Sequence, residues 1–462
     1  MRNNIRKLGY LLLSLLLILI FYLSYIQLEK GSYLAEHPRN KRFIEKISQT
    51  ERGKIYDRNG EIIAESLLQE NHWKRYYPYQ YEISHLVGYT SDKYGTAGVE
   101  AAYNKQLLGL TDRAKFLNFI GKIYNENPEG EEIFLTIDIK IQRLAAELLT
   151  KTNKPGAVVA LRPSTGEILV AASIPGYNPN KLEETWDELL NDENAPLLNR
   201  AFQGAYPPGS VMKLVTAAGA LSNGYNGKEK FNCPGYLEVD GFRLLDSEPH
   251  GTLNIHDGVV VSCNTIFGKL GLELGTKEFI EQAEQFGFGS DFGIPLNVRT
   301  STISKDKNMD TTELAEAAIG QGELLVSPLQ MALVASAIAN QGEMKQPYLV
   351  DEIVTSKGKT LHQNKPRTLL QSTDSSTARY IGEAMVDAVK LGTGKAARIS
   401  DIKVAGKTGT AENEHGSPHA WFVGFAPAEN PQVAVAVVVE NGGAGGTVAA
   451  PIAKQVILEA LR

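Results

Sequence analysis

The sequence predicts an α/β protein of the α+β type, in which an antiparallel sheet is packed between helices. A smaller α+β domain and one transmembrane helix are expected to precede it. Apolar strand-like runs come in two pairs, one within residues 156–173 and the other within residues 420–440. Helical patterns flank these strands at residues 139–149 and 448–461. Closely spaced strands with helices before and after them are typical of an antiparallel sheet layered with helices.

The N-terminus carries a membrane-targeting signal. Residues 1–7 (MRNNIRK) are basic, and residues 8–28 contain no charged side chain. An apolar run of this length can cross a bilayer as a helix, and the basic flank favours an N-terminus that stays in the cytoplasm. A cleaved signal peptide is the alternative, but it needs a small-x-small cleavage site, and this run ends in FYLSYIQLEK. We therefore expect a cytoplasmic tail, a single-pass anchor in the cell membrane and an extracellular body.

The body has the composition of a globular protein, since 43% of the 462 residues are hydrophobic and 22% are charged. The net charge of −6 provides no general attraction to phosphate backbones, which argues against a nucleic-acid partner. Only Cys233 and Cys263 are present, so the fold does not rest on a disulfide framework, and their pairing stays open. The histidines are scattered and no Cys/His cluster has metal-ligand spacing, so we expect neither a metal nor a cofactor.

Residues 29–130 are predicted to form the smaller domain. Its first part, to about residue 50, is mixed and charged and favours a helical stalk. Lys54–Tyr56 and Glu61–Ala64 then flank Asp-Arg-Asn-Gly, which predicts a β-hairpin because Asn-Gly is a strong turn signal. The rest is rich in Tyr, Gly and Asn with short apolar patches, which indicates a limited core.

Residues 131–462 are predicted to form the larger domain. Leu135–Ile137 is strand-like, and Asp138 is expected to cap the helix at residues 139–149. Further strands are predicted in GAVVAL, EILVAAS, AWFVGFAP and QVAVAVVVE, before the closing helix. The central block, from about residue 175 to residue 400, is expected to be mainly helix and loop.

The stretch AYPPGSVMKLVTAAGAL holds a Ser-x-x-Lys pair, Ser210 and Lys213. Pro-Pro-Gly forces a turn, and Ser210 then begins a helical pattern, so it lies where free N–H groups favour negative charge. Lys213 follows one turn later on the same face, within reach of the serine oxygen. The alternative is a capping serine beside a surface lysine. Three other Ser-x-x-Lys pairs, at Ser304, Ser356 and Ser400, lack such a helix.

Two further motifs bear on that choice. Ser262 and Asn264 lie in the apolar run VVVSCNTIF, where a polar pair must be hydrogen-bonded or functional, because burying it unpaired costs about 1–3 kcal/mol per group. The segment VAGKTGTAE (404–412) holds Lys-Thr-Gly and reads as a strand whose glycine permits close backbone approach. For each motif considered alone there is an alternative. Ser262 and Asn264 would be a hydrogen-bonded polar pair in the core, and the Lys-Thr-Gly segment would be a Gly-rich turn.

In this order, Ser-x-x-Lys, Ser-x-Asn and Lys-Thr-Gly resemble the three signatures of the serine acyl enzymes that include penicillin-binding proteins and β-lactamases. Other segments, from Glu51 to the end, are similar to recurring segments of class B penicillin-binding proteins, in that family's order. They are ERGKIYDRNGEIIA, GTAGVEAAYNKQLLG, LTIDIKIQRLAAELL, GAVVALRPSTGEILVAASIPGYNPN, IGQGELLVSPLQMA and HAWFVGFAPAENP. The chain is most similar to the short PbpA-like form. The resemblance implies a pedestal or dimerisation-type domain at 29–130 and a penicillin-binding, serine β-lactamase-like transpeptidase domain at 131–462.

The resemblance implies a peptidoglycan D,D-transpeptidase. Ser210 would attack the D-Ala–D-Ala bond of a stem peptide, release the terminal D-Ala and pass the acyl group to an amine on a neighbouring strand. Lys213 is the expected base, because a serine alcohol needs one and no histidine stands in a nucleophile motif. Its neutral form would be favoured by desolvation and by the nearby cation of Lys407.

The remaining motif residues have implied roles in the same reaction. Ser262 would relay a proton to the leaving amine, and Asn264 would hold Lys213 and a substrate amide. Thr408 and Thr410, with Lys407, would hold the terminal carboxylate on the Lys-Thr-Gly strand, which contains Gly409. The backbone N–H groups of Ser210 and Thr410 would form the oxyanion hole.

The implied partners are stem peptides ending in D-Ala-D-Ala, β-lactam antibiotics that trap Ser210, and a SEDS-family glycan polymerase in the membrane. Three alternatives remain. A β-lactamase is disfavoured because we find no Glu-x-x-Leu-Asn type segment and because β-lactamases lack a pedestal. A D,D-carboxypeptidase differs only in its acceptor, and a non-catalytic scaffold is disfavoured by the intact set of three motifs.

Overall fold

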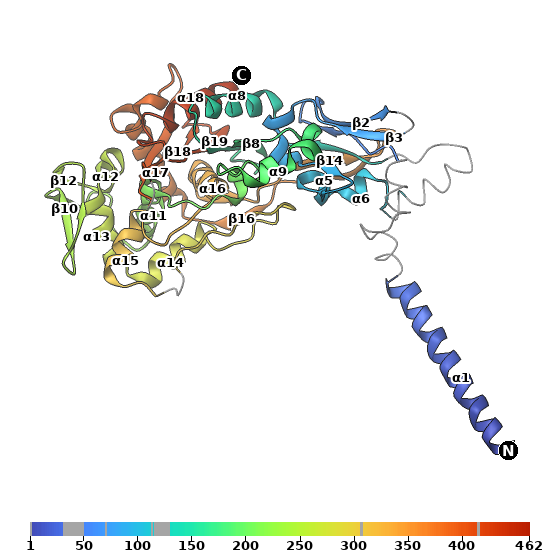
Figure 1. The fold of residues 1–462 in the computed structure, drawn as a ribbon. Helices are drawn as coiled ribbons and strands as arrows, with labels where there is room; N and C mark the ends of the chain where they lie inside the picture. The colour runs from blue at the N-terminus through green and yellow to red at the C-terminus, as the bar shows by residue number, and fades with distance from the viewer. Residues whose placement is uncertain are drawn as a thin grey trace.

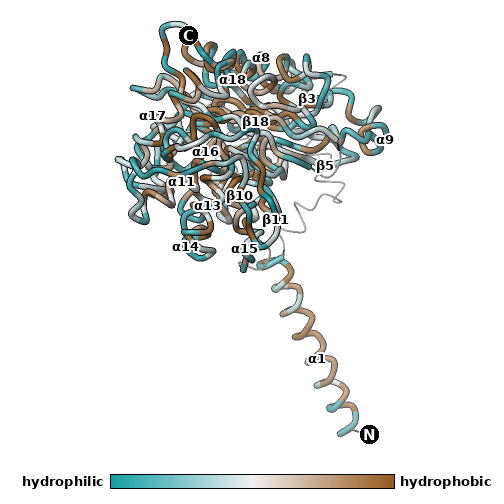
Figure 2. The backbone as a smooth tube through the Cα atoms, turned by 90° about the vertical axis from the view of Figure 1, so that its left-hand side faces the viewer, coloured by the Kyte–Doolittle hydropathy of each residue, from teal (hydrophilic) through white to brown (hydrophobic). Residues whose placement is uncertain are grey.

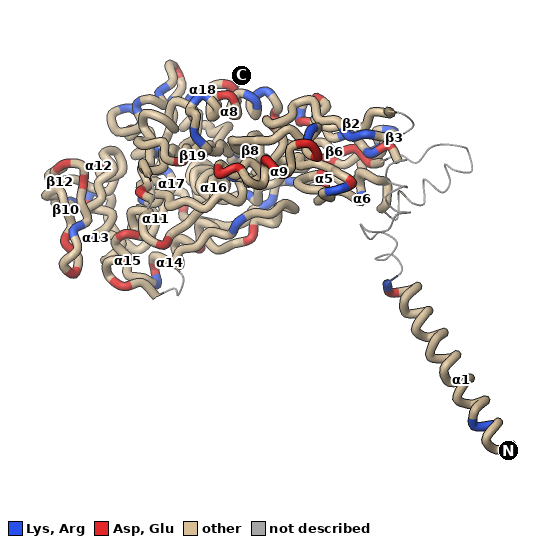
Figure 3. Tube along the Cα trace, viewed as in Figure 1, with Lys and Arg blue, Asp and Glu red and all other residues tan. Residues whose placement is uncertain are grey.

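The computed structural model describes residues 2–30, 50–69, 72–111, 114, 130–304, 308–413 and 416–462. Its N-terminal helix α1 (Arg2–Tyr25) continues through a π-helical turn, Ile26–Lys30. Over Asn3–Lys30 this helix is long and apolar enough to cross a membrane, and none of it is buried in the protein. Figure 2 shows its hydrophobic length, and Figure 3 shows its charged residues gathered towards its ends. Most of the predicted stalk (residues 29 to about 50) lies outside the described residues, which leave out residues 31–49.

The predicted hairpin at the start of the smaller domain is present. Strands β1 (Ile55–Tyr56) and β2 (Ile62–Gln69) pair antiparallel, and the Asp57 carboxylate accepts hydrogen bonds from the N–H groups of Asn59 (2.7 Å) and Glu61 (2.9 Å) in the turn. Gly60 takes a positive φ of 85°, which a glycine adopts without strain. The β-hairpin and its Asn-Gly turn are therefore present where the sequence predicted them.

The hairpin belongs to a six-stranded sheet of order β15-β14-β6-β1-β2-β3. The added strands are β3 (His72–Tyr76), β6 (Glu132–Leu135), β14 (Val350–Val354) and β15 (Thr360–Gln363). Strand β14 thus lies among N-terminal strands, as Figure 1 shows. The short elements beside this sheet are η2 (Gln80–Glu82), α4 (Ser84–Val87), β4 (Thr90–Ser91), β5 (Gly95–Thr96), α5 (Gly98–Ala102) and α6 (Asn104–Leu107).

A buried ion network braces this region. Glu100 is fully buried and accepts from Arg52 Nε and Arg75 Nε, each at 2.6 Å. Burial raises the pKa of Glu100, but the two guanidinium groups outweigh burial and hold it below its usual value.

The central sheet of the larger domain is antiparallel, with the order β17-β18-β19-β7-β8. Its strands are β7 (Gly156–Leu161), β8 (Ile168–Ile174), β17 (Ala405–Ala411), β18 (His419–Ala426) and β19 (Val433–Val439). Every residue of β7, β8 and β19 is buried, because both faces of the sheet are covered. The predicted antiparallel sheet between helices is confirmed.

Two separate cores lie on the two faces of this sheet. Helices α8 (Ile139–Thr150) and α18 (Ala449–Ala460) cover one face, and α16 (Pro328–Ala339) covers the other (Figure 1). Asp138 caps α8 by accepting from the N–H groups of Lys140 and Ile141, as predicted. The strand predicted at Leu135–Ile137 instead ends at Leu135, as part of β6.

The central block is mainly helical but holds more strands than the sequence predicted. Besides α16, its helices are η3 (Pro179–Lys181), α9 (Leu182–Asn191), α10 (Arg200–Gln203), η4 (Gly209–Val211), α11 (Lys213–Ser222), α12 (Ile255–Val261), α13 (Asn264–Leu274), α14 (Thr276–Gln285), α15 (Thr311–Ala318), α17 (Ser375–Lys390) and η5 (Lys395–Ala397). Besides β14 and β15, its strands are β9 (Phe231–Cys233), β10 (Tyr236–Val239), β11 (Phe242–Leu245), β12 (Gly251–Leu253), β13 (Glu343–Lys345) and β16 (Thr368–Gln371). These strands are too short for a period-two pattern to mark them.

Candidate active site

Ser210 lies in a tight turn pressed between two other segments. The turn is the 3-10 element η4, and α11 begins only at Lys213, so the helix predicted from Ser210 starts with a 3-10 turn. Gly209 has a φ of +58°, and its N–H donates to the Gly320 carbonyl at 2.8 Å. A Cβ on Gly320 would lie 2.0 Å from the Gly209 carbonyl oxygen. The Ser210 turn therefore fits against Gly320 only because position 320 is glycine, and position 209 needs glycine because a Cβ there would lie 2.8 Å from the Thr410 carbonyl oxygen.

Lys213 is fully buried and points at the Ser-x-Asn motif. Its Nζ donates to the Ser262 carbonyl and to Asn264 Oδ1, each at 2.6 Å, and lies 3.4 Å from Ser262 Oγ. Burial lowers the pKa of Lys213 to about 8, although the charge of Asp246 opposes this shift. No hydrogen bond joins Lys213 to Ser210 among the described residues. The structure thus brings Lys213 to Ser262 and Asn264 and places Ser210 three residues before Lys213, in the 3-10 turn that leads into α11.

Lys407 approaches the same hydroxyl from strand β17. Its Nζ donates to Ser262 Oγ at 2.7 Å and to the Thr408 carbonyl at 3.0 Å, and the side chain is fully buried. Burial, followed by the positive charge of Lys213, holds the pKa of Lys407 well below its usual value. Two lysines from distant segments therefore converge on Ser262, and the charge of Lys213 disfavours the charged form of Lys407.

The geometry of the Ser-x-Asn motif depends on an unusual backbone. Ser262 ends α12 in the left-handed conformation (φ 64°, ψ 40°), which costs a non-glycine residue about 1–2 kcal/mol. Asn264 then begins α13, and its side-chain amide donates to the Leu245 carbonyl at 2.6 Å. Because both ends of the Asn264 amide are held, its Oδ1 is fixed towards Lys213.

Asp246 supports this motif, and the sequence patterns did not single it out. Its carboxylate accepts from the N–H groups of Asn264 (2.5 Å) and Thr265 (2.8 Å) and from the Thr265 hydroxyl (2.5 Å). Burial raises the pKa of Asp246, but these hydrogen bonds outweigh burial and lower it overall. The residue lies in a polar segment between two short strands, which gave no signal of a capping role.

A set of potential metal ligands lies directly behind the motif. Cys233, Asp246, His250 and Cys263 offer ligand atoms that all lie within 4.8 Å of one another. Both thiols are free, and each donates to Asp246 Oδ2, at 3.3 and 3.4 Å. Thiolate, imidazole and carboxylate groups are the donors that zinc accepts. The sequence shows no metal-ligand spacing for these residues because they come from separate strands and loops and converge only in the fold.

The Lys-Thr-Gly residues lie along β17, which is an edge strand of the central sheet. Thr408 is buried and shares a 2.6 Å hydrogen bond with the Thr393 hydroxyl, a partner that no motif indicated. A Cβ on Gly409 would lie 3.0 Å from the Pro208 carbonyl oxygen, and Thr410 beside it is exposed. The outer edge of β17 is unpaired in its sheet, which is the arrangement to which an extended peptide can add.

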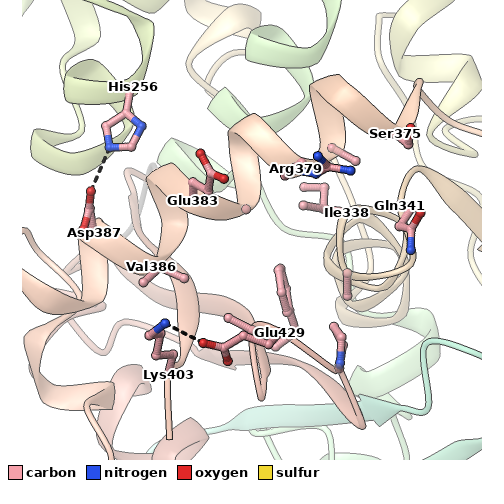
Figure 4. Close-up of a pocket in the computed structure, with 16 residues that line it drawn as sticks. His256, Ile338, Gln341, Ser375, Arg379, Glu383, Val386, Asp387, Lys403 and Glu429 are labelled. Carbon is pink, nitrogen blue, oxygen red and sulfur yellow. Dashed lines mark hydrogen bonds and ion pairs between the residues drawn. The ribbon is translucent and has the colours of Figure 1, made fainter.

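A cavity of about 700 Å³ lies away from these residues. It is lined by α12, α17 and the ends of α16 and β18 and contains none of the eight motif residues. A hydrogen bond between His256 and Asp387 (3.0 Å) and an ion pair of Lys403 with Glu429 (2.6 Å) lie in its wall, as Figure 4 shows. The cavity offers no nucleophile with an adjacent base, so the motif residues are the stronger candidate site.

Comparisons with known proteins agree with the motifs. Residues 156–458 match the family model "Penicillin binding protein transpeptidase domain", and residues 52–133 match "Penicillin binding protein A dimerisation domain". The chain is 33% identical to the peptidoglycan D,D-transpeptidase PbpA of Mycolicibacterium smegmatis, over 100% of this chain and 99% of that one.

Solved structures show the same similarity. A ceftriaxone acyl-enzyme complex of penicillin-binding protein A from M. tuberculosis aligns with a TM-score of 0.87 at 32% identity, covering 91% of this chain and 100% of that one. A D,D-transpeptidase domain from Eggerthella lenta aligns with a TM-score of 0.81 at 34% identity, covering 89% and 98%.

Proposed function

Because the chain belongs to the penicillin-binding protein transpeptidase family, we propose that it is a peptidoglycan D,D-transpeptidase that works through an acyl-enzyme on Ser210. One observation carries the proposal. Lys213, Ser262, Asn264 and Lys407 come from three motifs far apart in the sequence and form one hydrogen-bonded cluster beside the Ser210 turn. The names of relatives and the acyl-enzyme structures of penicillin-binding protein A support the same reaction.

In the proposed acylation step, neutral Lys213 takes the proton of the Ser210 hydroxyl as its oxygen attacks the carbonyl carbon of the penultimate D-Ala. The negative charge that develops on the carbonyl oxygen is stabilised by the N–H groups of Ser210 and Thr410. The proton passes through Ser262 to the nitrogen of the terminal D-Ala, which leaves as the C–N bond breaks. An acceptor amine then attacks the ester, and its proton returns by the same route.

Lys407 fits the role of carboxylate binder in this proposal. Its charged form is disfavoured in the free protein by burial and by Lys213. A substrate carboxylate, held also by Thr408 and Thr410, would stabilise the charged form of Lys407. The cation so formed lies near Lys213 and would favour its neutral form, so that substrate binding prepares the base.

We also propose the arrangement of the chain. Residues 1–7 form a cytoplasmic tail, 8–28 a membrane anchor, 29–130 a pedestal or dimerisation-type domain and 131–462 an extracellular transpeptidase domain. The apolar helix α1 and the two matched family regions support this division. A SEDS-family polymerase in the same membrane is the proposed source of glycan strands, since a cross-linking enzyme needs strands to join.

The test is labelling of the full-length chain in detergent with fluorescent penicillin, comparing the wild type with Ser210→Ala. We expect a stable adduct on the wild type and none on the variant. Equal labelling of both proteins, or no labelling of the wild type, would overturn the proposal. Rapid hydrolysis of the adduct would indicate a β-lactamase. Supplied with lipid-linked strands and a polymerase, the wild type should form cross-linked dimer, whereas free D-Ala without dimer would indicate a carboxypeptidase.

A further inference from the structure

We propose that Trp421 is a positioning residue that holds the Ser210 turn against strand β17 and so sets the spacing of the two oxyanion donors. This inference rests on the proposed function. The three catalytic motifs do not include Trp421. It lies on β18, the strand next to β17, which carries the Lys-Thr-Gly residues.

Trp421 is linked to both halves of the site. Its backbone pairs directly with Gly409 in the β17–β18 ladder. Its indole Nε1 donates to the Pro207 carbonyl at 3.0 Å, three residues before Ser210. The main chain therefore fixes the strand that carries Thr410, while the side chain fixes the loop that carries Ser210.

The two halves meet with no spare room. A Cβ on Gly409 would lie 2.9 Å from Trp421 Cβ and 3.0 Å from the Pro208 carbonyl oxygen. A Cβ on Gly209 would lie 2.8 Å from the Thr410 carbonyl oxygen. Because backbone touches backbone here, a small shift of the loop changes the relative positions of the Ser210 and Thr410 N–H groups.

The indole is itself held in place. Trp421 is fully buried, and the Tyr206 ring packs against it edge to face with centroids 6.1 Å apart. The Tyr206 hydroxyl donates to Glu440 Oε1 at 2.6 Å, and Arg200 Nε donates to the same oxygen at 2.7 Å. Since Glu440 directly follows β19, this network ties the loop to the central sheet at a second point.

The use of the indole N–H distinguishes a positioning role from simple core packing. A core tryptophan needs a partner for its N–H, but that partner could lie anywhere. Here the partner is the carbonyl of the loop that delivers the nucleophile. Without that donor the Pro207 carbonyl loses its bond to the sheet, and the loop is held less firmly.

The test measures acylation by a chromogenic cephalosporin in the full-length chain, separating the pre-acylation Kd from the acylation rate constant. In Trp421→Phe we expect the rate constant to fall about tenfold and Kd to change less than twofold, because misplacement of catalytic groups acts on the chemical step. A second variant carries benzothienylalanine at position 421, in which sulfur replaces the ring N–H and the shape is kept. We expect the same fall there.

The matched control is Phe288→Leu, which alters another buried aromatic side chain outside the site. It should lower the Tm without changing the rate constant. The pH midpoint of acylation should stay at the wild-type value in both position-421 variants, because Lys213 is untouched. Rate constants equal to that of the control, or a loss confined to Kd, would overturn the inference. A wild type that is not acylated at Ser210 would instead overturn the proposed function.

Discussion

At the scale of single residues, the site depends on burying two lysines that share one hydroxyl. Lys213 and Lys407 are both fully buried, and both reach Ser262. Desolvation disfavours a buried ammonium, and a second ammonium nearby disfavours it further. The resemblance implied that desolvation and Lys407 would favour neutral Lys213, and burial does lower the pKa of Lys213. The resemblance also implied that Asn264 would hold Lys213, and that hydrogen bond is present at 2.6 Å. The hydrogen bond from Lys213 to the Ser262 carbonyl was not predicted.

Acylation should depend on pH through Lys213. The charged lysine cannot accept the Ser210 proton, so the acylation rate should be low below the pKa of about 8, rise through it and level off above it. The measurement is the acylation rate constant between pH 6 and pH 10. Lys213→Arg, which stays charged throughout, should be inactive at every pH. A flat wild-type profile would exclude Lys213 as the titrating base.

Asp246 should matter for both stability and activity. Asp246→Asn places an N–H₂ group among five donors, so the free energy of unfolding should fall by about 2 kcal/mol. The acylation rate should fall as well, because Asn264 loses its support. The matched control is Asp374→Ala, which removes the capping side chain of α17, away from the motif residues. Urea unfolding should show a loss of about 1 kcal/mol there with normal acylation. Equal acylation by both variants would refute a role of Asp246 in positioning.

At the scale of elements, the sequence predicted the strands and helices that hydrophobic patterns mark. It missed a turn whose geometry depends on a backbone contact with a distant segment. The strands β7, β8, β18 and β19 and the closing helix lie within a residue or two of their predicted positions. The 3-10 turn before α11 was missed, because its geometry comes from the contact between Gly209 and Gly320 across more than a hundred residues. No local pattern encodes such a contact.

That contact gives a prediction for the turn. In Gly320→Ala the new Cβ would lie 2.0 Å from the Gly209 carbonyl oxygen at a φ of +84°, so the Ser210 turn must shift. We expect a loss of about 3 kcal/mol in unfolding free energy and a fall of about a hundredfold in acylation. Gly322→Ala is the matched control, since its φ is +75° and its nearest neighbour is a flexible Glu316 side chain at 3.5 Å. It should cost about 1 kcal/mol and leave acylation intact. Similar effects in both variants would show that backbone strain alone matters.

At the scale of the whole molecule, the two predicted domains share structure at their junction. The six-stranded sheet takes β1, β2 and β3 from before residue 130 and β6, β14 and β15 from after it. The Asp-Arg-Asn-Gly turn contacts the start of α8, where Asp57 Oδ2 accepts from the Ile139 N–H at 3.2 Å and Asn59 Nδ2 donates to Asp138 Oδ2 at 3.0 Å. The Asn-Gly turn signal predicted the hairpin. It did not predict that the turn also contacts the segment 136–139, because that contact depends on a distant part of the chain.

This junction predicts that a substitution outside the proposed transpeptidase domain will destabilise that domain. Asp57 is fully buried and accepts from the N–H groups of Asn59, Glu61 and Ile139. Asp57→Ala leaves these donors without their acceptor, so the unfolding free energy should fall by about 2–3 kcal/mol. Retained penicillin labelling after heating reports on the transpeptidase domain alone, and its midpoint temperature should fall in the variant. Asp92→Ala, in a surface turn, should stay within about 0.5 kcal/mol of the wild type. If Asp57→Ala lowered only the far-UV circular dichroism transition and left the labelling midpoint unchanged, the two regions would unfold independently, and the shared sheet would not couple them.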